Sequence, residues 1–334
     1  MDTLTVLGAG SWGTAIAKGL ADRGHTVRLW ARREEQARAI QETRENATYL
    51  PGARLPETLT ATHDLERALA GSHGVYVVVP SHGLRQVVSE ARPFLPAHGP
   101  IVSATKGIEN DSLLWMTRVL EDVLPEETHG RICALGGPSF AKEVAAGMPS
   151  AVCLASRDSR IGMLAQQQLA SERFRVYTTE DIVGVEIGGA LKNVMAIAAG
   201  AADGLGFGHN ARAALITRGL AEMARLGMHL GANPLTLAGL SGLGDLVLTC
   251  TGELSRNRRV GLEMASGRSL AAVLADMRMV AEGVKTAKSA YDLAAREAVD
   301  MPITTEVYRA LYEGKPPSEA VGSLLSRNLR SERD

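Results

Sequence analysis

The 334-residue sequence has little of several features that mark particular classes of protein. Aromatic residues make up only 4%, too few for a surface on which nucleic-acid bases stack. Lys and Arg number 36 and Asp and Glu 37, so the net charge is -1 and any anion site must be local. No uninterrupted apolar run approaches the ~18 residues that span a bilayer, and the N-terminus has the pattern of a strand rather than of a signal peptide. We therefore expect no nucleic-acid partner and no integral membrane segment.

Cysteine is also scarce. Cys133 and Cys153 lie in apolar strand-like runs, Cys250 is isolated, and no Cys-x-x-Cys occurs. This pattern predicts neither a disulfide framework nor a zinc site, and the eight histidines show no metal-ligand spacing. We therefore expect no metal and a reducing, cytoplasmic location.

The first half of the chain alternates between short apolar runs and helical patterns. The run at 75–79 is typical of a strand buried on both faces. The other expected strands are 3–7, 26–30, 101–104, 132–135, 151–155 and 175–178, with helical patterns at 34–45, 65–70, 84–91 and 113–124. Such alternation predicts an α/β fold with a mostly parallel sheet covered on both faces.

A glycine-rich turn follows the first expected strand and opens a helical pattern. Gly8 allows a tight turn, Gly10 lets the backbone approach a pyrophosphate, and Gly13 lets the helix pack on the strand. The free N–H groups at the helix start would face the phosphates. In this context Gly-x-Gly-x-x-Gly predicts dinucleotide binding; the alternative is a turn that only packs a helix on a sheet.

The pattern changes near Asp181, after which only helices are expected, at 182–204, 211–226, 259–265, 270–276, 286–297 and 303–312. A chain of this length can form two domains. The sequence thus predicts a Rossmann-type dinucleotide-binding domain at 1–182 and an all-helical substrate-binding and catalytic domain at 183–334.

The second expected strand ends at Arg32 and Arg33. A site for NAD carries a carboxylate there, ~20 residues after the glycines, to bind the ribose 2′-OH. Two guanidinium groups instead suit a 2′-phosphate, which favours NADP(H) and leaves NAD(H) possible. Alternatively both arginines are solvated, and Glu34 or Glu35 reaches the ribose.

Two lysines and an aspartate are candidates for the chemistry. No Lys or Arg other than Lys192 occurs from 176 to 211, a stretch rich in Gly, Ala and aliphatic residues, so Lys192 is either a surface stem or a buried ammonium suited to proton transfer. Lys106 follows an expected strand, where ligands of parallel sheets bind, unless it is an ordinary loop lysine. Asp245 lies among apolar residues and needs a partner, for which Lys192 is suited.

Two further segments could bind anions. Gly137 and Ser139 follow a strand and open a helix, as an anion-binding turn or an ordinary N-cap. The run 255–259 places three guanidinium groups and an amide at a helix start, which predicts a phosphate site, or otherwise a solvated basic turn.

Taken together, these segments resemble the bacterial-type NAD(P)-dependent glycerol-3-phosphate dehydrogenase family over nearly the whole chain. The matching blocks occur in order at 8–15, 103–107, 137–144, 189–194, 213–219, 242–246, 255–258 and 282–284. The resemblance implies reversible hydride transfer between a nicotinamide cofactor and dihydroxyacetone phosphate, giving sn-glycerol 3-phosphate for phospholipid synthesis. It also implies a small-molecule substrate and a homodimer.

The resemblance assigns roles residue by residue. It implies that Lys192 is the general acid and, in reverse, the base. Substrate-binding residues would be Lys106, Gly137, Ser139, Lys192, Asp245, Ser255, Arg256 and Asn257. Cofactor-binding residues would be Gly8, Gly10, Ser11, Trp12, Gly13, Arg32, Arg33, Tyr49, Lys106, Ala141, Arg256, Val280 and Glu282. Ala281, between Val280 and Glu282, replaces a more common aliphatic, and Tyr49, Arg32 and Arg33 lie in a variable part of the family pattern.

Two other functions fit parts of the pattern. One is a two-domain reductase of a β-hydroxyacid or of ketopantoate, whose carboxylate substrate need not fill a pocket at Arg256. The other is a regulatory protein that senses nicotinamide without turnover. Such a sensor would not need both Lys192 and Asp245, and the sequence contains no basic recognition helix.

Overall fold

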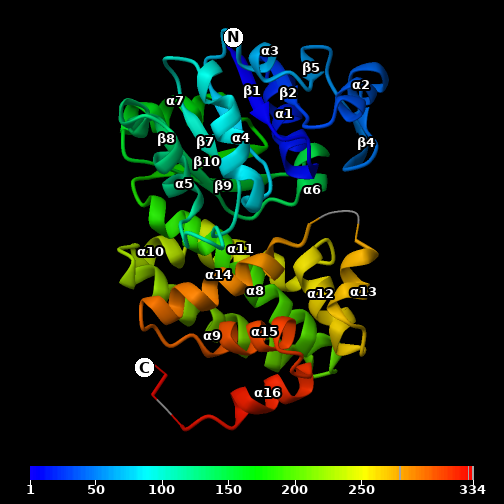
Figure 1. Cartoon of the computed structure of the whole chain (residues 1–334), viewed down its shortest axis with the longest axis vertical. Coiled ribbons are helices and arrows are strands. Elements are labelled where there is room, and N and C mark those ends of the chain that lie inside the picture. Colours follow the sequence, from blue (N-terminus) through cyan, green and yellow to red (C-terminus); the bar gives the residue numbers. More distant parts are fainter. Residues whose placement is uncertain (278–279, 330, 333–334) are drawn as a thin grey trace.

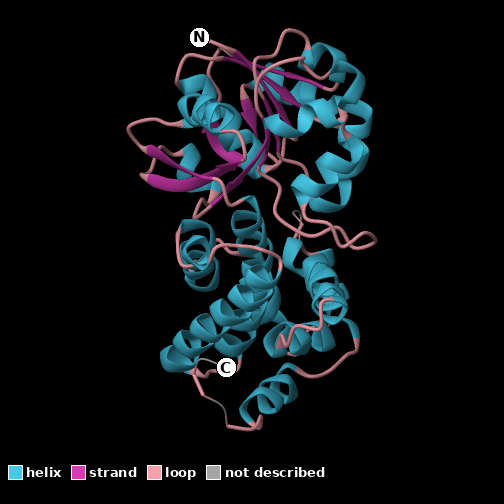
Figure 2. Ribbon diagram, turned by 90° about the vertical axis from the view of Figure 1, so that its left-hand side faces the viewer, coloured by secondary structure: helices cyan, strands magenta, loops and turns pink. Residues whose placement is uncertain are grey.

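The computed structural model of the chain describes residues 1–277, 280–329 and 331–332. It has an upper part built on a sheet, which contains the N-terminus, and a lower helical part (Figure 1). In the view turned by 90°, strands occupy only the upper part (Figure 2). The predicted α/β class with a helical second half is confirmed.

The sheet has eight strands in the order β10-β9-β8-β7-β6-β1-β2-β5. All neighbours are parallel except β8 and β9. The strands are β1 (Thr3–Leu7), β2 (Thr26–Trp30), β5 (Leu59–Thr62), β6 (Val75–Val77), β7 (Ile101–Ser103), β8 (Ile132–Gly136), β9 (Ser150–Ser156) and β10 (Phe174–Thr179). The seven predicted strands are confirmed, and only the edge strand β5 of this sheet was not predicted.

A small hairpin, β3 (Glu45–Asn46) with β4 (Leu50–Arg54), also escaped prediction. The helix expected at 34–45 ends earlier, because Arg44 adopts a φ of 58° that a right-handed helix cannot continue. The short hairpin that follows then places Tyr49 in the turn beside the start of α1 (Ser11–Asp22).

Helices cover both faces of the sheet because alternate strand residues point to opposite sides. Leu4 and Val6 of β1 pack with Leu20 of α1 on one face. Leu7 packs with Leu84 on the other face. Besides α1, the helices of this part are α2 (Glu34–Thr43), α3 (Leu65–Leu69), α4 (Leu84–Ala91), α5 (Met116–Val123), α6 (Ala141–Ala145) and α7 (Ser159–Leu169).

The second half contains only helices among the residues that the structure describes. They are α8 (Ile182–Gly204), α9 (Gly208–His229), α10 (Pro234–Leu237), α11 (Asp245–Thr251), α12 (Arg256–Ala265), α13 (Leu270–Ala275), α14 (Glu282–Arg296), α15 (Pro302–Tyr312) and α16 (Pro317–Leu325), with a π-helix at Leu240–Gly244. The six predicted helices are confirmed with small shifts at their ends, whereas α10, α11 and α16 were not predicted.

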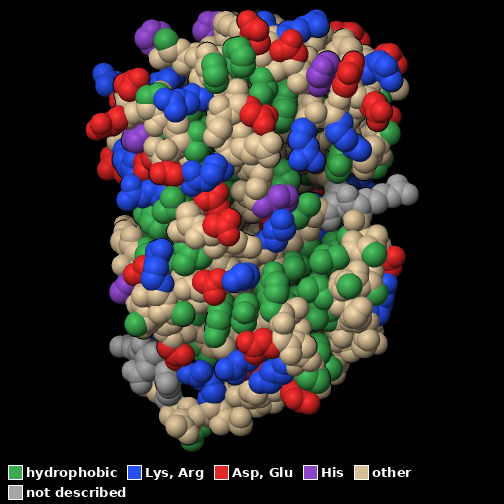
Figure 3. Space-filling model, in the orientation of Figure 1, with side chains coloured by type: hydrophobic (Ala, Val, Ile, Leu, Met, Phe, Trp, Pro, Cys, Tyr) green, Lys and Arg blue, Asp and Glu red, His purple; other side chains and the backbone are tan. Residues whose placement is uncertain are grey.

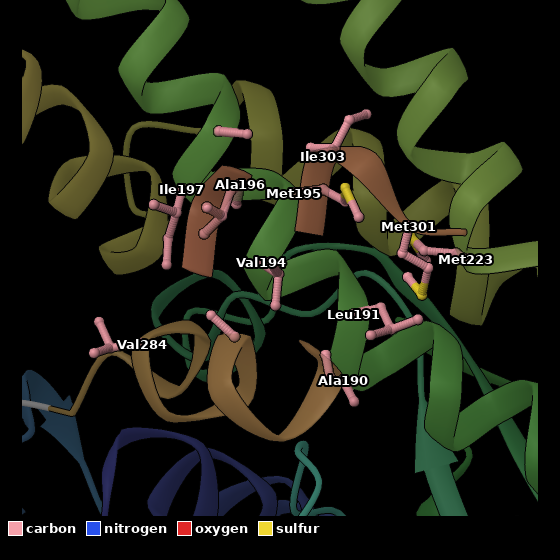
Figure 4. Packing of buried hydrophobic residues seen from close by; sticks show 14 of the residues in the cluster. Ala190, Leu191, Val194, Met195, Ala196, Ile197, Met223, Val284, Met301 and Ile303 are labelled. Atoms are coloured by element: carbon pink, nitrogen blue, oxygen red, sulfur yellow. The ribbon is translucent and has the colours of Figure 1, made fainter. Parts of the chain in front are cut away.

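Helix α8 forms the axis of the helical half. Leu191, Val194 and Met195 are fully buried and pack against residues of neighbouring helices, among them Met223 and Ile303 (Figure 4). Helix α8 is long and apolar enough to cross a membrane, but 94% of the window that passes this test is buried inside the protein. The search for uninterrupted apolar runs in the sequence did not find α8, because polar residues such as Lys192 and Asn193 interrupt its apolar residues.

A second segment, Pro234–Thr251, also passes the same test of length and composition, with 39% of its window buried. It is not one straight helix, since it includes α10, the π-helix and α11. Two such segments are weak evidence for a membrane span, because core helices of soluble proteins pass the same test.

Glycines bring α8 and α12 into close contact. A Cβ at Gly200 of α8 would lie 1.8 Å from the carbonyl oxygen of Arg258. A Cβ at Gly261 of α12 would lie 1.9 Å from the carbonyl oxygen of Ile197. No side chain fits between the two backbones, so the crossing fixes the first turn of α12 against α8.

A buried carboxylate joins the two halves. Glu186 of α8 accepts hydrogen bonds from the backbone N–H of Thr117, at 3.0 and 3.2 Å, and from its hydroxyl. Thr117 lies in the first turn of α5, where N–H groups have no partner within the helix. Burial raises the pKa of Glu186 to about 8, and the bonds to Thr117 oppose that rise. Glu186 thus caps a helix of the first half from within the second half.

The glycine crossing predicts a large effect of one methyl group. Gly261→Ala should destabilise the protein by about 1–3 kcal/mol, because the added carbon overlaps a backbone oxygen that cannot move freely. Gly19→Ala is the matched control: Gly19 lies in α1, and a Cβ there would meet nothing within 4 Å, so this change should be neutral or slightly stabilising. Urea denaturation followed by circular dichroism measures both. Equal midpoints for the two variants would contradict the close crossing.

Candidate active site

Two lysines share one buried carboxylate at the junction of the two halves. Lys192 Nζ lies 2.6 Å from Asp245 Oδ1, and Lys106 Nζ lies 2.6 Å from Asp245 Oδ2. The Asp245 side chain is 1% exposed, Lys192 9% and Lys106 18%. Lys192 is therefore a buried ammonium rather than a surface stem, and its expected pairing with Asp245 is confirmed.

Each of the three side chains comes from a different element. Lys192 lies in the middle of α8, and Lys106 lies in the loop after β7. The stem of Lys106 passes Gly189 of α8, where a Cβ would be 3.6 Å from its Cγ. Asp245 is the first residue of α11, directly after the π-helix. A π-helix changes the direction in which the following side chains point, and here the Asp245 carboxylate lies between the two lysines.

Burial and charge set the ionisation of this group. Burial lowers the pKa of Lys192 to about 8; Lys106 lowers it too, while Asp245 opposes the shift. Burial alone would raise the pKa of Asp245, but the two neighbouring ammonium groups outweigh it and hold that pKa below its usual value. The arrangement therefore combines a firmly ionised carboxylate with an ammonium that can lose its proton near neutral pH.

Two residues that the sequence patterns did not indicate lie at this site: Thr249, which contacts Lys192, and Asn193, which follows Lys192 on α8. Thr249 Oγ1 accepts a hydrogen bond from Lys192 Nζ at 2.8 Å and donates to the carbonyl oxygen of Asp245 at 2.6 Å. Asn193 accepts a bond at 2.8 Å from the amide of Asn257 on α12. The position of Thr249, four residues after Asp245, is the signal that could have found it, since such residues share a helix face.

Gly137 and Ser139 lie beside Lys106. Lys106 Nζ donates to the carbonyl oxygen of Gly137 at 3.2 Å, and Ser139 Oγ donates to the same oxygen at 2.9 Å. Gly137 has a φ of +123°, a conformation that favours glycine. Phe140, rather than Ser139, is the N-cap of the five-residue helix α6, so the N-cap alternative for Ser139 is wrong.

The basic run at the start of α12 is less open to an anion than the sequence suggested. Ser255 is the N-cap, and its hydroxyl accepts a bond from the N–H of Arg258 at 3.2 Å. Arg258 pairs with Asp203 at 2.6 Å, and Arg259 pairs with Glu263 at 3.2 Å. Two of the three guanidinium groups thus have carboxylate partners within the protein.

Arg256 and Asn257 differ in their surroundings. Arg256 is exposed at the first position of α12, and no carboxylate lies within ion-pair distance of it in the described part of the chain. Asn257 is buried; its amide nitrogen donates to Asn193, and its amide oxygen accepts from the N–H of Gly283 at 2.9 Å. Asn257 therefore links α8, α12 and α14, while Arg256 remains available to an anion.

The glycine-rich turn has the geometry expected for a pyrophosphate. Gly8 has a φ of +119°, and a Cβ at Gly13 would lie 1.8 Å from the carbonyl oxygen of Gly8. At Gly10, by contrast, a Cβ would meet nothing within 4 Å, so the backbone borders open space. The buried indole nitrogen of Trp12, at the start of α1, has no hydrogen-bond partner. The residues present therefore fit a dinucleotide whose phosphates approach Gly10.

The other predicted cofactor residues surround this turn. Ser11 Oγ donates to the carbonyl oxygen of Tyr49 at 2.6 Å, which ties the β3–β4 hairpin to α1. Ala141 opens α6, which packs against α1. Arg32 and Arg33 are exposed just after β2, and Arg33 is the N-cap of α2.

The last two predicted cofactor residues lie at the start of α14. Val280 is 39% exposed, and Glu282 is the first residue of the helix. Ser81, after β6, donates to Glu282 Oε2 at 2.6 Å. Burial raises the pKa of Glu282, and the bond from Ser81 opposes that rise. This contact joins the helical half to the carboxyl edge of the sheet.

Neither a metal centre nor a disulfide is found in the described ranges. No group of three or more His, Cys, Asp or Glu side chains is placed to hold a metal ion there. Cys133, Cys153 and Cys250 are free thiols.

Known proteins match the whole of this architecture. Family models described as the N-terminus and the C-terminus of NAD-dependent glycerol-3-phosphate dehydrogenase match residues 3–162 and 181–322. A glycerol-3-phosphate dehydrogenase (NAD(P)+) of Myxococcus xanthus is 56% identical over 328 residues, 98% of this chain and 98% of its own. The corresponding protein of Geobacter sp. is 53% identical over 99% of both chains.

A solved structure agrees with the sequence relatives. The crystal structure of glycerol-3-phosphate dehydrogenase from Coxiella burnetii is 42% identical, covers 98% of this chain and 99% of its own, and has a TM-score of 0.93. The resemblance seen in the sequence is thus confirmed by independent comparisons. This chain belongs to the NAD-dependent glycerol-3-phosphate dehydrogenase family.

Proposed function

We propose that this chain reduces the C2 ketone of dihydroxyacetone phosphate to sn-glycerol 3-phosphate and catalyses the reverse oxidation. The proposal is supported above all by the buried Lys192–Asp245–Lys106 group, in which Lys192 comes from α8, Lys106 from the loop after β7 and Asp245 from α11. The names and full-length coverage of the relatives support the same reaction.

A bound nicotinamide dinucleotide supplies or accepts the hydride. Lys192 acts as the general acid: as the ketone oxygen gains negative charge, its ammonium donates a proton to that oxygen, and in reverse the neutral amine accepts it. Asp245 and Thr249 fix the direction of Lys192 Nζ through their bonds at 2.6 and 2.8 Å. Lys106 adds positive charge beside the same oxygen and holds Gly137 and Ser139 near the substrate.

The substrate phosphate is assigned to the start of α12. Arg256 supplies a guanidinium group, and the first-turn N–H groups of the helix add positive potential. Ser255 and Asn257 shape this site, Ser255 as the N-cap and Asn257 through its bonds to Asn193 and Gly283. We expect a phosphate here to displace water from Arg256 rather than to break these bonds.

NADP(H) is the preferred cofactor in this proposal. Arg32 and Arg33 follow β2, where the 2′ group of the adenosine ribose is bound, and both are exposed. Glu34 and Glu35, the alternative partners of a 2′-OH, are exposed in the first turn of α2. The names of the relatives support NAD or NADP without distinguishing them.

The remaining proposals concern the assembly of the protein, the limits of its domains and its location in the cell. We infer a homodimer, a division into domains at 1–182 and 183–334, and a cytoplasmic location. The two family models, at 3–162 and 181–322, and the start of α8 at Ile182 support the division. The three free cysteines support a reducing compartment, where the product would serve phospholipid synthesis.

The charged trio predicts a specific pH dependence. Because Lys192 must be protonated to act as an acid, kcat/KM for ketone reduction should fall above about pH 8, while that for alcohol oxidation should rise with pH up to that value. Asp245→Asn removes the charge that supports the ammonium, so the fall should move to lower pH by about one unit. Steady-state assays from pH 6 to 10 test this.

The control for these profiles is Lys192→Ala, which should lower kcat by about 10²–10⁴-fold while leaving cofactor affinity nearly unchanged. Turnover within a few-fold of wild type would show that Lys192 is not the acid. An unchanged profile in Asp245→Asn would show that Asp245 does not set its ionisation.

Arg256 should act mainly on substrate binding. Arg256→Ala should raise KM for dihydroxyacetone phosphate by about 10–100-fold, as expected for a lost hydrogen bond between charged groups. Arg259→Ala, on the same helix but paired with Glu263, is the matched control and should leave KM unchanged. A substrate with a carboxylate in place of the phosphate should be reduced with a much lower kcat/KM. If ketopantoate were reduced as well as dihydroxyacetone phosphate, the substrate assignment would be wrong.

Cofactor preference is measured by following oxidation of NADPH and NADH in parallel with dihydroxyacetone phosphate. We expect a higher kcat/KM with NADPH, because Arg32 and Arg33 can bind the 2′-phosphate. Replacing both by alanine should lower kcat/KM for NADPH by at least about tenfold and change that for NADH little. No substrate-dependent oxidation, with cofactor binding intact, would instead favour a nicotinamide sensor.

A further inference from the structure

Three basic side chains that take no part in the chemistry at Lys192 lie on segments that adjoin the junction of the two halves. They are Arg32, after β2, His82, in the short helix Ser81–Gly83 after β6, and Lys285, on α14. No carboxylate lies within ion-pair distance of any of them in residues 1–277, 280–329 and 331–332. In Figure 3 a histidine and basic side chains are visible at this junction.

A contact between neighbouring residues places His82 and Lys285 on adjoining segments. The 2.6 Å bond from Ser81 to Glu282 fixes the start of α14 against the loop after β6. His82 is the next residue after Ser81, and Lys285 lies one turn after Glu282. Strands β2 and β6 both neighbour β1, so Arg32 and His82 follow strand ends at the same edge of the sheet.

The electrostatics agree with this placement. Burial lowers the pKa of His82, and the positive charges of Lys285 and then Arg32 lower it further. Burial raises the pKa of Glu282, whose carboxylate accepts the hydrogen bond from Ser81, and the charges of Arg256 and Lys285 oppose that rise. Protonation of His82 would add a third positive charge beside those of Lys285 and Arg32, and an anion between them would offset this repulsion.

The other anions of the proposed reaction have sites elsewhere. The pyrophosphate belongs at Gly10 and the start of α1, and the substrate phosphate at Arg256 and the start of α12. The end of β2 is where the 2′ position of the adenosine ribose lies in this fold. We propose that Lys285 and His82, together with Arg32, form the site for the 2′-phosphate of NADP(H), so that both halves of the protein recognise it.

This inference rests on the proposed preference for NADP(H). It adds Lys285 and His82 to the site for the 2′-phosphate and predicts how binding changes with pH. Lys285 belongs to the helical half, so a 2′-phosphate links that half to the sheet, whereas a 2′-hydroxyl cannot. A phosphate dianion beside His82 also favours its protonated form. Binding of the 2′-phosphate should therefore take up a proton and tighten as the pH falls from about 8 to about 6.

The test uses fragments that lack nicotinamide, so it does not depend on catalysis. Isothermal titration of the full chain with adenosine 2′,5′-bisphosphate and with adenosine 5′-monophosphate separates the contribution of the 2′-phosphate. Lys285→Ala should weaken binding of the bisphosphate by about tenfold and leave the monophosphate unchanged. Lys288→Ala is the matched control, since Lys288 lies one turn further along α14 and pairs with Asp292 at 2.7 Å.

The remaining variants separate this inference from the proposed cofactor preference. His82→Gln should abolish the tightening of bisphosphate binding at low pH. If Arg32→Ala weakens bisphosphate binding and Lys285→Ala does not, NADP(H) preference stands and the role of Lys285 is refuted. If the wild type binds both fragments equally and Arg32→Ala has no effect, the cofactor preference itself is wrong.

Discussion

The rest of the structure depends on two ammonium groups that share one buried carboxylate. Removing three charged groups from water is costly, and the cost is offset only when each charge meets its partner at hydrogen-bond distance. Lys192, Asp245 and Lys106 meet this condition only if α8, α11 and the loop after β7 lie where they do. The contacts that the chemistry needs therefore also require the observed placement of the two halves.

Glycine makes that placement possible around α8. Gly189 leaves room for the stem of Lys106. Gly200 faces the backbone of Arg258 and Gly261 faces the backbone of Ile197, so no side chain fits where α8 and α12 cross. A helix rich in small residues can thus be approached closely from several sides. Glu186 adds a polar tie to α5. Around α8, glycines allow neighbouring elements to approach closely, and the hydrogen bonds of Glu186 fix the position of α5.

Sequence patterns located the regular elements because buried strands and amphipathic helices repeat with fixed periods. They missed elements that depend on single backbone conformations or on short segments. Arg44 ends its helix with a positive φ, β5 is a four-residue edge strand, and α16 begins within the Pro316-Pro317 pair. The π-helix before Asp245 gives no periodic signal, yet it directs the carboxylate at the centre of the site.

The sequence by itself determined the α/β class, the glycine-rich turn and, through its resemblance, the family. These properties depend on residues that lie close together in the sequence. Only the tertiary structure decided that Lys192 is buried, that Thr249 holds it, and that Arg258 is already paired with Asp203. Burial and charge partners are properties of residues far apart in sequence, so no local pattern can distinguish a lysine that moves a proton from one that lies in solvent.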